Sequence, residues 1–269
     1  MGRLTALTRA CHPEPTAAVT LFAGALAVAS GRGAAGVFAV VAAVLTGQLS
    51  VGWSNDVIDR ARDRAGGRVD KPVAAGVLPA GAVATAAGLA ALACVPLSFA
   101  SGRAAGCVHL VAVAVAWAYN LGVKATRLSV VPYTVSFALL PSFVVLGLPG
   151  HPAPPWWLVA GGALLGSGAH FANALPDLAT DAATGVRSLP ERLGPARSRA
   201  WALGLLAAGS MVAALGPAGP GPARLGALGA VVVLVALGAR LGERHLFRAA
   251  MAVAAIDVGL VIAAGSRLR

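Results

Sequence analysis

Long apolar segments, repeated along almost the whole chain, constrain the fold of this sequence more than any other feature. Each is close to the roughly 20 residues that a helix needs to cross the apolar core of a bilayer. They lie at residues 16–31, 34–53, 74–100, 104–122, 129–148, 156–175, 200–216, 224–241 and 246–265. With 58% apolar and only 12% charged residues, the composition excludes a disordered chain and an ordinary soluble enzyme. The sequence predicts one all-α membrane domain, residues 1–269, a helical bundle with about nine transmembrane helices.

The formal net charge of +11 raises the question of nucleic-acid binding. The basic residues are scattered between the apolar segments, however, and do not gather on one soluble face, so we expect no nucleic-acid partner. With the N-terminus placed inside, 16 of the 21 basic residues fall on cytoplasmic segments. This bias predicts an integral protein of a bacterial cell membrane, whose partner is the lipid bilayer. The N-terminus and the two long polar segments, 54–73 and 176–199, are then cytoplasmic.

Most of the ten acidic residues lie in or beside these two polar segments. Each segment holds an Asn followed by Asp four and eight residues later, and the two clusters are 118 residues apart. On a helix this spacing turns only about 40° per step, so each cluster forms one polar stripe. The two clusters comprise Asn55, Asp56, Asp59 and Asp63, and Asn173, Asp177 and Asp181.

Facing stripes of carboxylates predict a site for hard divalent cations. Mg²⁺ prefers oxygen ligands and is commonly held by one or two carboxylates together with substrate phosphate oxygens. Carboxylates alone would repel a diphosphate, so a metal ion belongs to such a site. The alternative for one cluster is a solvated helix extension with local ion pairs. The predicted metal ligands are Asp56, Asp59, Asp63, Asp177 and Asp181, of which all but Asp56 are also predicted catalytic residues.

These motifs make the chain resemble the UbiA superfamily of intramembrane prenyltransferases. The family's first motif, NDxxDxxxD, is matched by the cluster that begins at Asn55, and its second, DxxxD, by Asp177 and Asp181. The run GVRSLPERLG at 185–194 resembles the sequence that follows the second motif in the family. Tyr119 and Lys124 are similar to the family's Tyr…Lys signature. Where the family usually has a further basic residue, this chain has Ala125, and Arg127 is the nearest substitute.

The resemblance implies a ring of nine helices around a central cavity, capped on the cytoplasmic side by the two Asp-rich loops. It further implies that Mg²⁺ bridges these aspartates and the diphosphate of an isoprenoid donor. The prenyl group is then transferred to an acceptor, often aromatic, whose identity the sequence does not give. The residues that we expect to bind the diphosphate are Asn55, Arg64, Tyr119, Lys124, Arg127, Asn173 and Arg187.

Several polar residues have two open roles. Asn55 and Asn173 either bind the diphosphate or orient the aspartates. Asp70 either binds metal or locks its loop by pairing with an arginine, and His170 either contacts substrate or is simply packed. Asp257 falls in the middle of the last apolar segment, where a carboxyl group needs a polar partner inside the bundle.

Two other functions are alternatives for the same pattern, and the motifs do not separate the first of them from prenyl transfer. A terpene cyclase or diphosphate lyase of the same fold would use the same motifs but no acceptor. A non-catalytic transporter or scaffold would share the helices, but transporters place charges near the middle of the membrane. Here the acidic residues cluster at one face.

Overall fold

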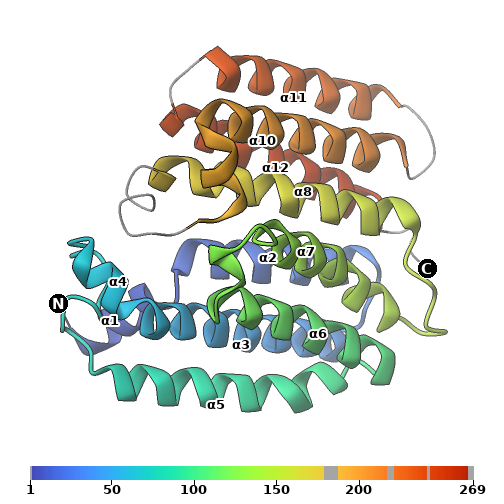
Figure 1. Ribbon diagram of the computed structural model, residues 1–269. Helices are drawn as coiled ribbons and strands as arrows, with labels where there is room; N and C mark the ends of the chain where they lie inside the picture. The colour runs from blue at the N-terminus through green and yellow to red at the C-terminus, as the bar shows by residue number, and fades with distance from the viewer. Residues whose placement is uncertain (1, 179–186, 217–220, 241–242, 266–269) are drawn as a thin grey trace.

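The computed structural model describes residues 2–178, 187–216, 221–240 and 243–265, and every regular element in these ranges is a helix (Figure 1). This confirms the all-α prediction. The helices are α1 (Arg3–Ala10), α2 (Pro13–Ala29), α3 (Ala34–Ile58), α4 (Arg60–Ala65), α5 (Ala80–Phe99), α6 (Arg103–Asn120), η1 (Val123–Ala125), α7 (Val130–Leu146), α8 (Trp156–Ala174), η2 (Leu175–Asp177), α10 (Leu189–Leu215), α11 (Pro222–Arg240) and α12 (Glu243–Ala263).

Within the described ranges, a helix covers each of the nine apolar segments. Three of these helices, α3, α5 and α10, are both long and apolar enough to cross a membrane. The count of nine spans therefore stays a prediction. Two helix starts were predicted wrongly. Helix α5 begins at Ala80, six residues after the predicted start, because residues 74–79, which follow Pro72 and end at Pro79, form turns and bends. Helix α10 begins at Leu189, well before residue 200, and bends at Gly194, whose φ is 78°.

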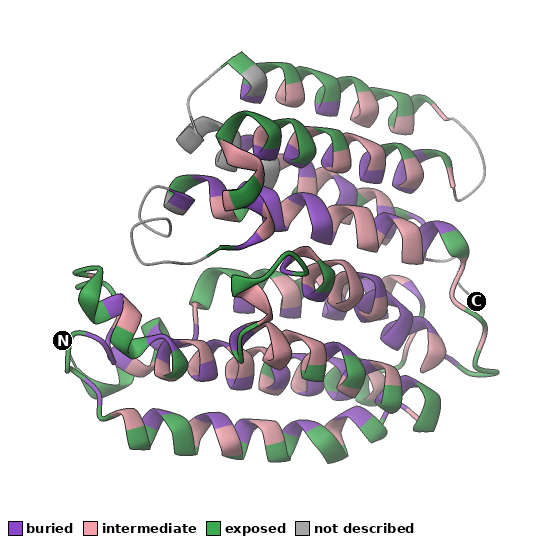
Figure 2. Cartoon of the chain, viewed as in Figure 1, coloured by how far each residue is buried: buried purple, intermediate pink, exposed green. Residues whose placement is uncertain are grey.

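Large apolar side chains are exposed on the outer helices, which is the arrangement expected for a surface in contact with lipid. On α5, Leu89 and Leu92 are 62% and 70% exposed, and on α11 Val232 is 66% exposed. Figure 2 shows exposed residues along the outer faces of both helices. The carboxyl group of Asp257 on α12 is instead fully buried, and it accepts a hydrogen bond of 2.9 Å from Ser210 of α10. Ser210 is thus the polar partner that the sequence analysis required.

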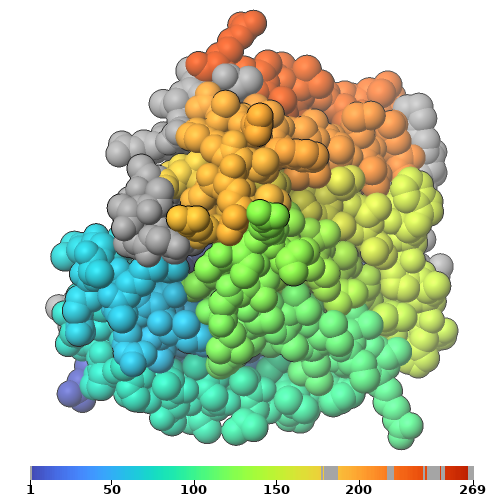
Figure 3. All heavy atoms as spheres, viewed as in Figure 1, coloured from blue at the N-terminus to red at the C-terminus, as the bar shows by residue number. Residues whose placement is uncertain are grey.

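The N-terminal and C-terminal halves of the chain lie on opposite sides of the molecule (Figures 1 and 3). Helices α7 and α8 pack against each other, and α8 packs in turn against α10. A glycine permits the close approach of α7 and α8, because a Cβ at Gly166 would overlap the backbone carbonyl of Tyr133. Each half contributes one of the two Asp motifs: the first follows α3 and the second begins in α8.

The N-terminal helix α1 is not a membrane span but a short helix held against α3. The Trp53 indole donates a 2.9 Å hydrogen bond to the carbonyl of Leu7. One residue earlier, Gly52 meets the backbone of Cys11 so closely that any Cβ there would overlap the Cys11 carbonyl. The corner between α1 and α2 is therefore fixed on α3, one turn before the first Asp motif.

Candidate active site

The first Asp motif lies where α3 ends and α4 begins. Asp59 joins the two helices with near-helical angles, φ −81° and ψ −5°. Its N–H donates to the carbonyl of Asn55, and the Asp63 N–H donates to the carbonyl of Asp59, both over 2.9 Å. The backbone therefore continues almost helically, which agrees with the single stripe predicted for Asn55, Asp59 and Asp63.

Asp59 is the most heavily paired carboxylate of this motif. The ammonium group of Lys124, from η1, lies 2.5 Å from both of its oxygens, and Arg62 Nη2 lies 2.9 Å from Oδ2. Both side chains of the Asp59–Lys124 pair are buried, and burial lowers the pKa of Lys124 while its hydrogen bonds to Asp59 oppose this. The structure thus brings together two residues that the sequence placed in one site from 65 positions apart.

Asn55 connects Asp59 to α6. Its Nδ2 donates to Asp59 Oδ2 over 3.0 Å and to the Oδ1 of Asn120 over 3.1 Å. Asn120 in turn donates to the carbonyl of Val51 and to the hydroxyl of Ser54, both over 2.9 Å. Asn55 therefore orients Asp59, which is one of its two open roles. The sequence analysis missed Asn120, although it directly follows Tyr119.

The other two aspartates of the motif each have a buried oxygen that makes no hydrogen bond within the described part of the chain, Asp56 Oδ1 and Asp63 Oδ2. Asp56 is fully buried; its Oδ2 accepts from the Val73 N–H over 3.3 Å, and its Oδ1 lies 3.5 Å from Lys71 Nζ. Burial raises the pKa of Asp63, and the charge of Lys71 partly offsets this. Buried oxygens without partners are costly unless another group ligates them.

Lys71 and His12 lie beside the first motif, although the sequence analysis did not single them out. In the structure, Lys71 Nζ lies 2.8 Å from His12 Nε2. Burial and the nearby Lys71 charge lower the pKa of His12 to about 4, so its ring is neutral at pH 7 and accepts this hydrogen bond. The one sequence indication is weak: His12 precedes a proline at a helix start.

Aromatic residues link this region to the second motif. Tyr119 of α6 packs edge-on against Tyr133 of α7 and His170 of α8, with ring centroids 5.4 and 6.1 Å apart. Tyr133 hydrogen-bonds Asn173, the first residue of the second motif. The ring of His170 is buried and lies 3.0 Å from the hydroxyl of Ser129.

The second motif begins in α8 and continues into a short turn. Helix α8 ends at Ala174, and residues 175–177 form the 3₁₀ turn η2. The side chain of Asp177 and all of Asp181 lie outside the described residues, so their predicted metal-binding and catalytic roles stay predictions.

The predicted arginines lie at the edge of the site. Arg64 is exposed, and its Nε donates to the carbonyl of Ala74 over 3.1 Å, so in this structure it secures the loop. Arg127 and Arg187 are also exposed. Asp70 pairs with Arg68 through two hydrogen bonds of 3.0 Å, which lower the Asp70 pKa and support its loop-locking role.

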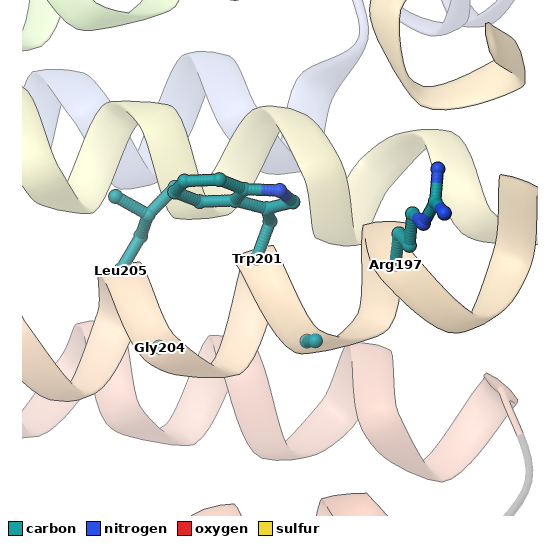
Figure 4. Close-up of a pocket in the computed structure, with 5 residues that line it drawn as sticks. Arg197, Trp201, Gly204 and Leu205 are labelled. Atoms are coloured by element: carbon teal, nitrogen blue, oxygen red, sulfur yellow. The ribbon is translucent and has the colours of Figure 1, made fainter. Parts of the chain in front are cut away.

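Among the described residues, no group of three or more His, Cys, Asp or Glu side chains is gathered tightly enough to hold a metal ion. The carboxylates of the first motif instead face cations: Asp59 faces Lys124 and Arg62, and Asp56 faces Lys71. A groove of about 440 Å³ lies elsewhere, along α10, lined by Arg197, Ala200, Trp201, Gly204 and Leu205 (Figure 4). It contains no residue of either motif.

Comparisons with known proteins agree with the motifs. The sequence model of the UbiA prenyltransferase family matches residues 17–256. A comparison with curated protein sequences finds no match.

Solved structures share the whole fold at low sequence identity. A UbiA homolog from Archaeoglobus fulgidus bound to DMAPP and Mg²⁺ has a TM-score of 0.73 and 14% identity, over 97% of this chain and 99% of that one. A UbiA homolog from Aeropyrum pernix K1 has a TM-score of 0.66 and 20% identity, over 95% of each chain. A digeranylgeranylglyceryl phosphate synthase has a TM-score of 0.69 and 15% identity, over 99% of each chain.

Proposed function

Because this chain belongs to the UbiA prenyltransferase family, we propose that it is an integral membrane enzyme that transfers a prenyl group from an isoprenoid diphosphate to an acceptor, with Mg²⁺ as cofactor. The observation that carries the proposal is the hydrogen-bonded group of Asn55, Asp59 and Lys124 at the end of α3. The structural neighbour bound to DMAPP and Mg²⁺ supports the donor class and the metal.

The residues of the first motif fit a magnesium site. Asp56 and Asp63 each offer a buried carboxylate oxygen without a hydrogen bond, and oxygen is the ligand that Mg²⁺ prefers. We propose that these two, with Asp59 and with Asp177 and Asp181 of the second motif, hold the metal. Bound Mg²⁺ would neutralise charge on the diphosphate and so make it a better leaving group.

The cationic side chains supply the rest of the leaving-group stabilisation. Lys124 and Lys71 are held beside the motif by Asp59, Asp56 and His12, so their N–H groups are fixed in place before a substrate binds. Donors fixed in advance stabilise charge that develops in a transition state without reorganising. Breaking the C–O bond leaves an allylic cation on the prenyl group and the electron pair on the diphosphate.

The helices then protect that cation from water. The interior beside the site is built from apolar and aromatic side chains, among them Tyr119, Tyr133 and Phe171. A dry interior keeps water from capturing the cation until the acceptor forms the new bond and gives up a proton. We propose one domain, residues 1–269, with the N-terminus and both Asp motifs on the cytoplasmic side.

The test is donor turnover by the purified protein in detergent. We expect geranyl, farnesyl or geranylgeranyl diphosphate to be consumed with Mg²⁺, but not with EDTA, when a bacterial lipid extract supplies the acceptor. Asp59→Asn and Asp177→Asn, which keep side-chain shape, should each abolish turnover. A labelled lipid product supports prenyl transfer. A labelled hydrocarbon formed without the extract would instead mean that the enzyme cyclises or lyses its donor. Full activity of both variants would overturn the site.

A further inference from the structure

His12 has an unusual backbone conformation, and the turn that it makes does not by itself require a histidine. Its φ of 56° and ψ of 71° lie in the left-handed region, which costs a residue with a Cβ on the order of 1 kcal/mol. The chain turns here between α1 and α2, and the following Pro13 disfavours the helical conformation at His12. A glycine would make this turn without strain, yet the chain carries an imidazole.

The strained corner is held in place from several sides. Thr16 Oγ1 donates to the carbonyl of Cys11 over 2.8 Å, and the Thr16 N–H donates to the carbonyl of His12 over 3.1 Å. The contact of Cys11 with Gly52 fixes the corner on α3. The His12 ring is thereby held within hydrogen-bond distance of Lys71.

The hydrogen bond between Lys71 and His12 has a definite direction. Lys71 has only N–H donors, so His12 Nε2 accepts from it and the ring proton is on Nδ1. The Nδ2 of Asn55 donates separately to Asp59 and to Asn120.

We propose that His12 is a positioning residue of the active site, which holds the Lys71 ammonium in the orientation that receives the diphosphate. Lys71 has three N–H groups. His12 and Asp56 fix the direction of the ammonium, and the proposal assigns a remaining N–H to a phosphate oxygen. This inference rests on the proposed function, because it assumes a diphosphate at the motif.

His12→Gly separates the role of the ring from that of the fold. Glycine removes the imidazole and relieves the left-handed strain, so we expect an unchanged or higher melting temperature. We also expect the Kd of inorganic diphosphate with Mg²⁺, measured by calorimetry on the full chain in detergent, to rise about ten-fold. A stabler protein that binds more weakly is not the outcome of a merely structural role.

The matched control is His151→Gly, at the other non-glycine position with positive φ among the described residues, where φ is 49°. His151 lies in the turn between α7 and α8; its ring Nδ1 lies 2.9 Å from the carbonyl of Leu146, and its N–H donates to the carbonyl of Leu148. We expect it to relieve the same strain and to leave diphosphate binding unchanged.

Two further measurements complete the test. Lys71→Met should weaken binding, and the double variant with His12→Gly should bind no more weakly than Lys71→Met alone, because His12 acts through Lys71. Wild-type affinity in His12→Gly, or additive losses in the double variant, would overturn the inference and leave the proposed function intact. If wild-type protein neither binds diphosphate with Mg²⁺ nor consumes a prenyl donor, the proposed function fails and the inference fails with it.

Discussion

The Asp59–Lys124 pair, with side chains 8% and 11% exposed, links two distant parts of the chain at one buried point. We predict that Lys124→Met lowers kcat/KM for the prenyl donor by about 100-fold or more, because a fixed cationic donor at the leaving group is lost. Asp59 keeps its contacts with Arg62 and Asn55, so the protein should still fold. Turnover close to that of the wild type would contradict a role for Lys124 at the diphosphate.

His12 gives a prediction about pH at the same scale. Its pKa is about 4 in the folded protein and near 6.5 when unfolded, so between these values only the unfolded state takes up the proton. The stabilising contribution of neutral His12 is therefore present above pH 6.5 and is lost as the pH falls toward 4. From pH 7 to pH 5 the loss is roughly 1–2 kcal/mol.

Thermal melts in EDTA at both pH values measure this loss. The wild type should lose more stability than His12→Gly does over the same interval. His151→Gly should instead follow the wild type, since it keeps His12. Equal pH dependence in wild type and His12→Gly would show that His12 is not held neutral in the folded state.

Residue-scale contacts were only partly predictable from the sequence. The Asp motifs and Lys124 have characteristic spacings, so they could be found before the fold was known. His12 and Lys71 are 59 positions apart, and Asn55 and Asn120 are 65 apart, so their contacts depend on how the helices pack. No local pattern encodes such a pair, and His12 could not be distinguished from an ordinary polar residue at a helix start.

Helix packing supplies a prediction at the scale of the elements. A Cβ at Gly166 of α8 would overlap the backbone of α7, whereas a Cβ at Gly204 of α10 meets no atom within 4 Å. We predict that Gly166→Ala destabilises the protein by about 1–3 kcal/mol because the helices must move apart. Gly204→Ala should instead stabilise it by roughly 0.5–1 kcal/mol, because alanine favours the helix and nothing opposes it.

The melting temperatures of the two variants, measured in one detergent, show whether helix packing or helix propensity determines the effect of the added methyl group. Both substitutions add the same methyl group to a helical glycine, so helix propensity alone predicts that both stabilise. Stabilisation by Gly166→Ala would mean that α7 and α8 do not approach as closely as described.

Hydropathy located every long helix, but it did not show what happens between the helices. Apolar runs report which residues avoid water, so the long helices could be anticipated, most of them within several residues. The start of α10 is the exception, since that helix begins at Leu189 and not near residue 200. The short helices α1 and α4 carry several charges and exposed positions, and no apolar period identifies them. The 3₁₀ turn after α8 and the bend at Gly194 depend on backbone angles that propensity does not specify.

The whole molecule places its ends on opposite sides. Gly265, just after α12, packs against Ala29 at the end of α2, whereas α1 lies beside the Asp motif at the other end of α3. We predict that a reporter at the C-terminus lies on the outer side of the membrane, opposite the cytoplasm. Alkaline phosphatase fused there should be active and green fluorescent protein should be dark, with the reverse after Thr126, between α6 and α7. A cytoplasmic C-terminus would contradict nine spans.

The two halves explain why the second motif was harder to place than the first. Each motif follows a helix of a different half, and α7 and α8 join the halves through close packing. The two clusters are 118 residues apart in the sequence, and only packing decides which faces of the halves meet. The aromatic bridge from Tyr119 to Tyr133 and on to Asn173 is the consequence of that packing.

The sequence contains only two lysines, and both lie against carboxylates of the first motif. Apart from the α-amino group, every primary amine of this protein is therefore a group of the site. A reagent that acylates amines becomes an active-site probe without any engineering, because no surface lysine competes for it. Mass spectrometry of the labelled protein would then measure the occupancy of the site directly, because a bound diphosphate protects Lys71 and Lys124 from the reagent.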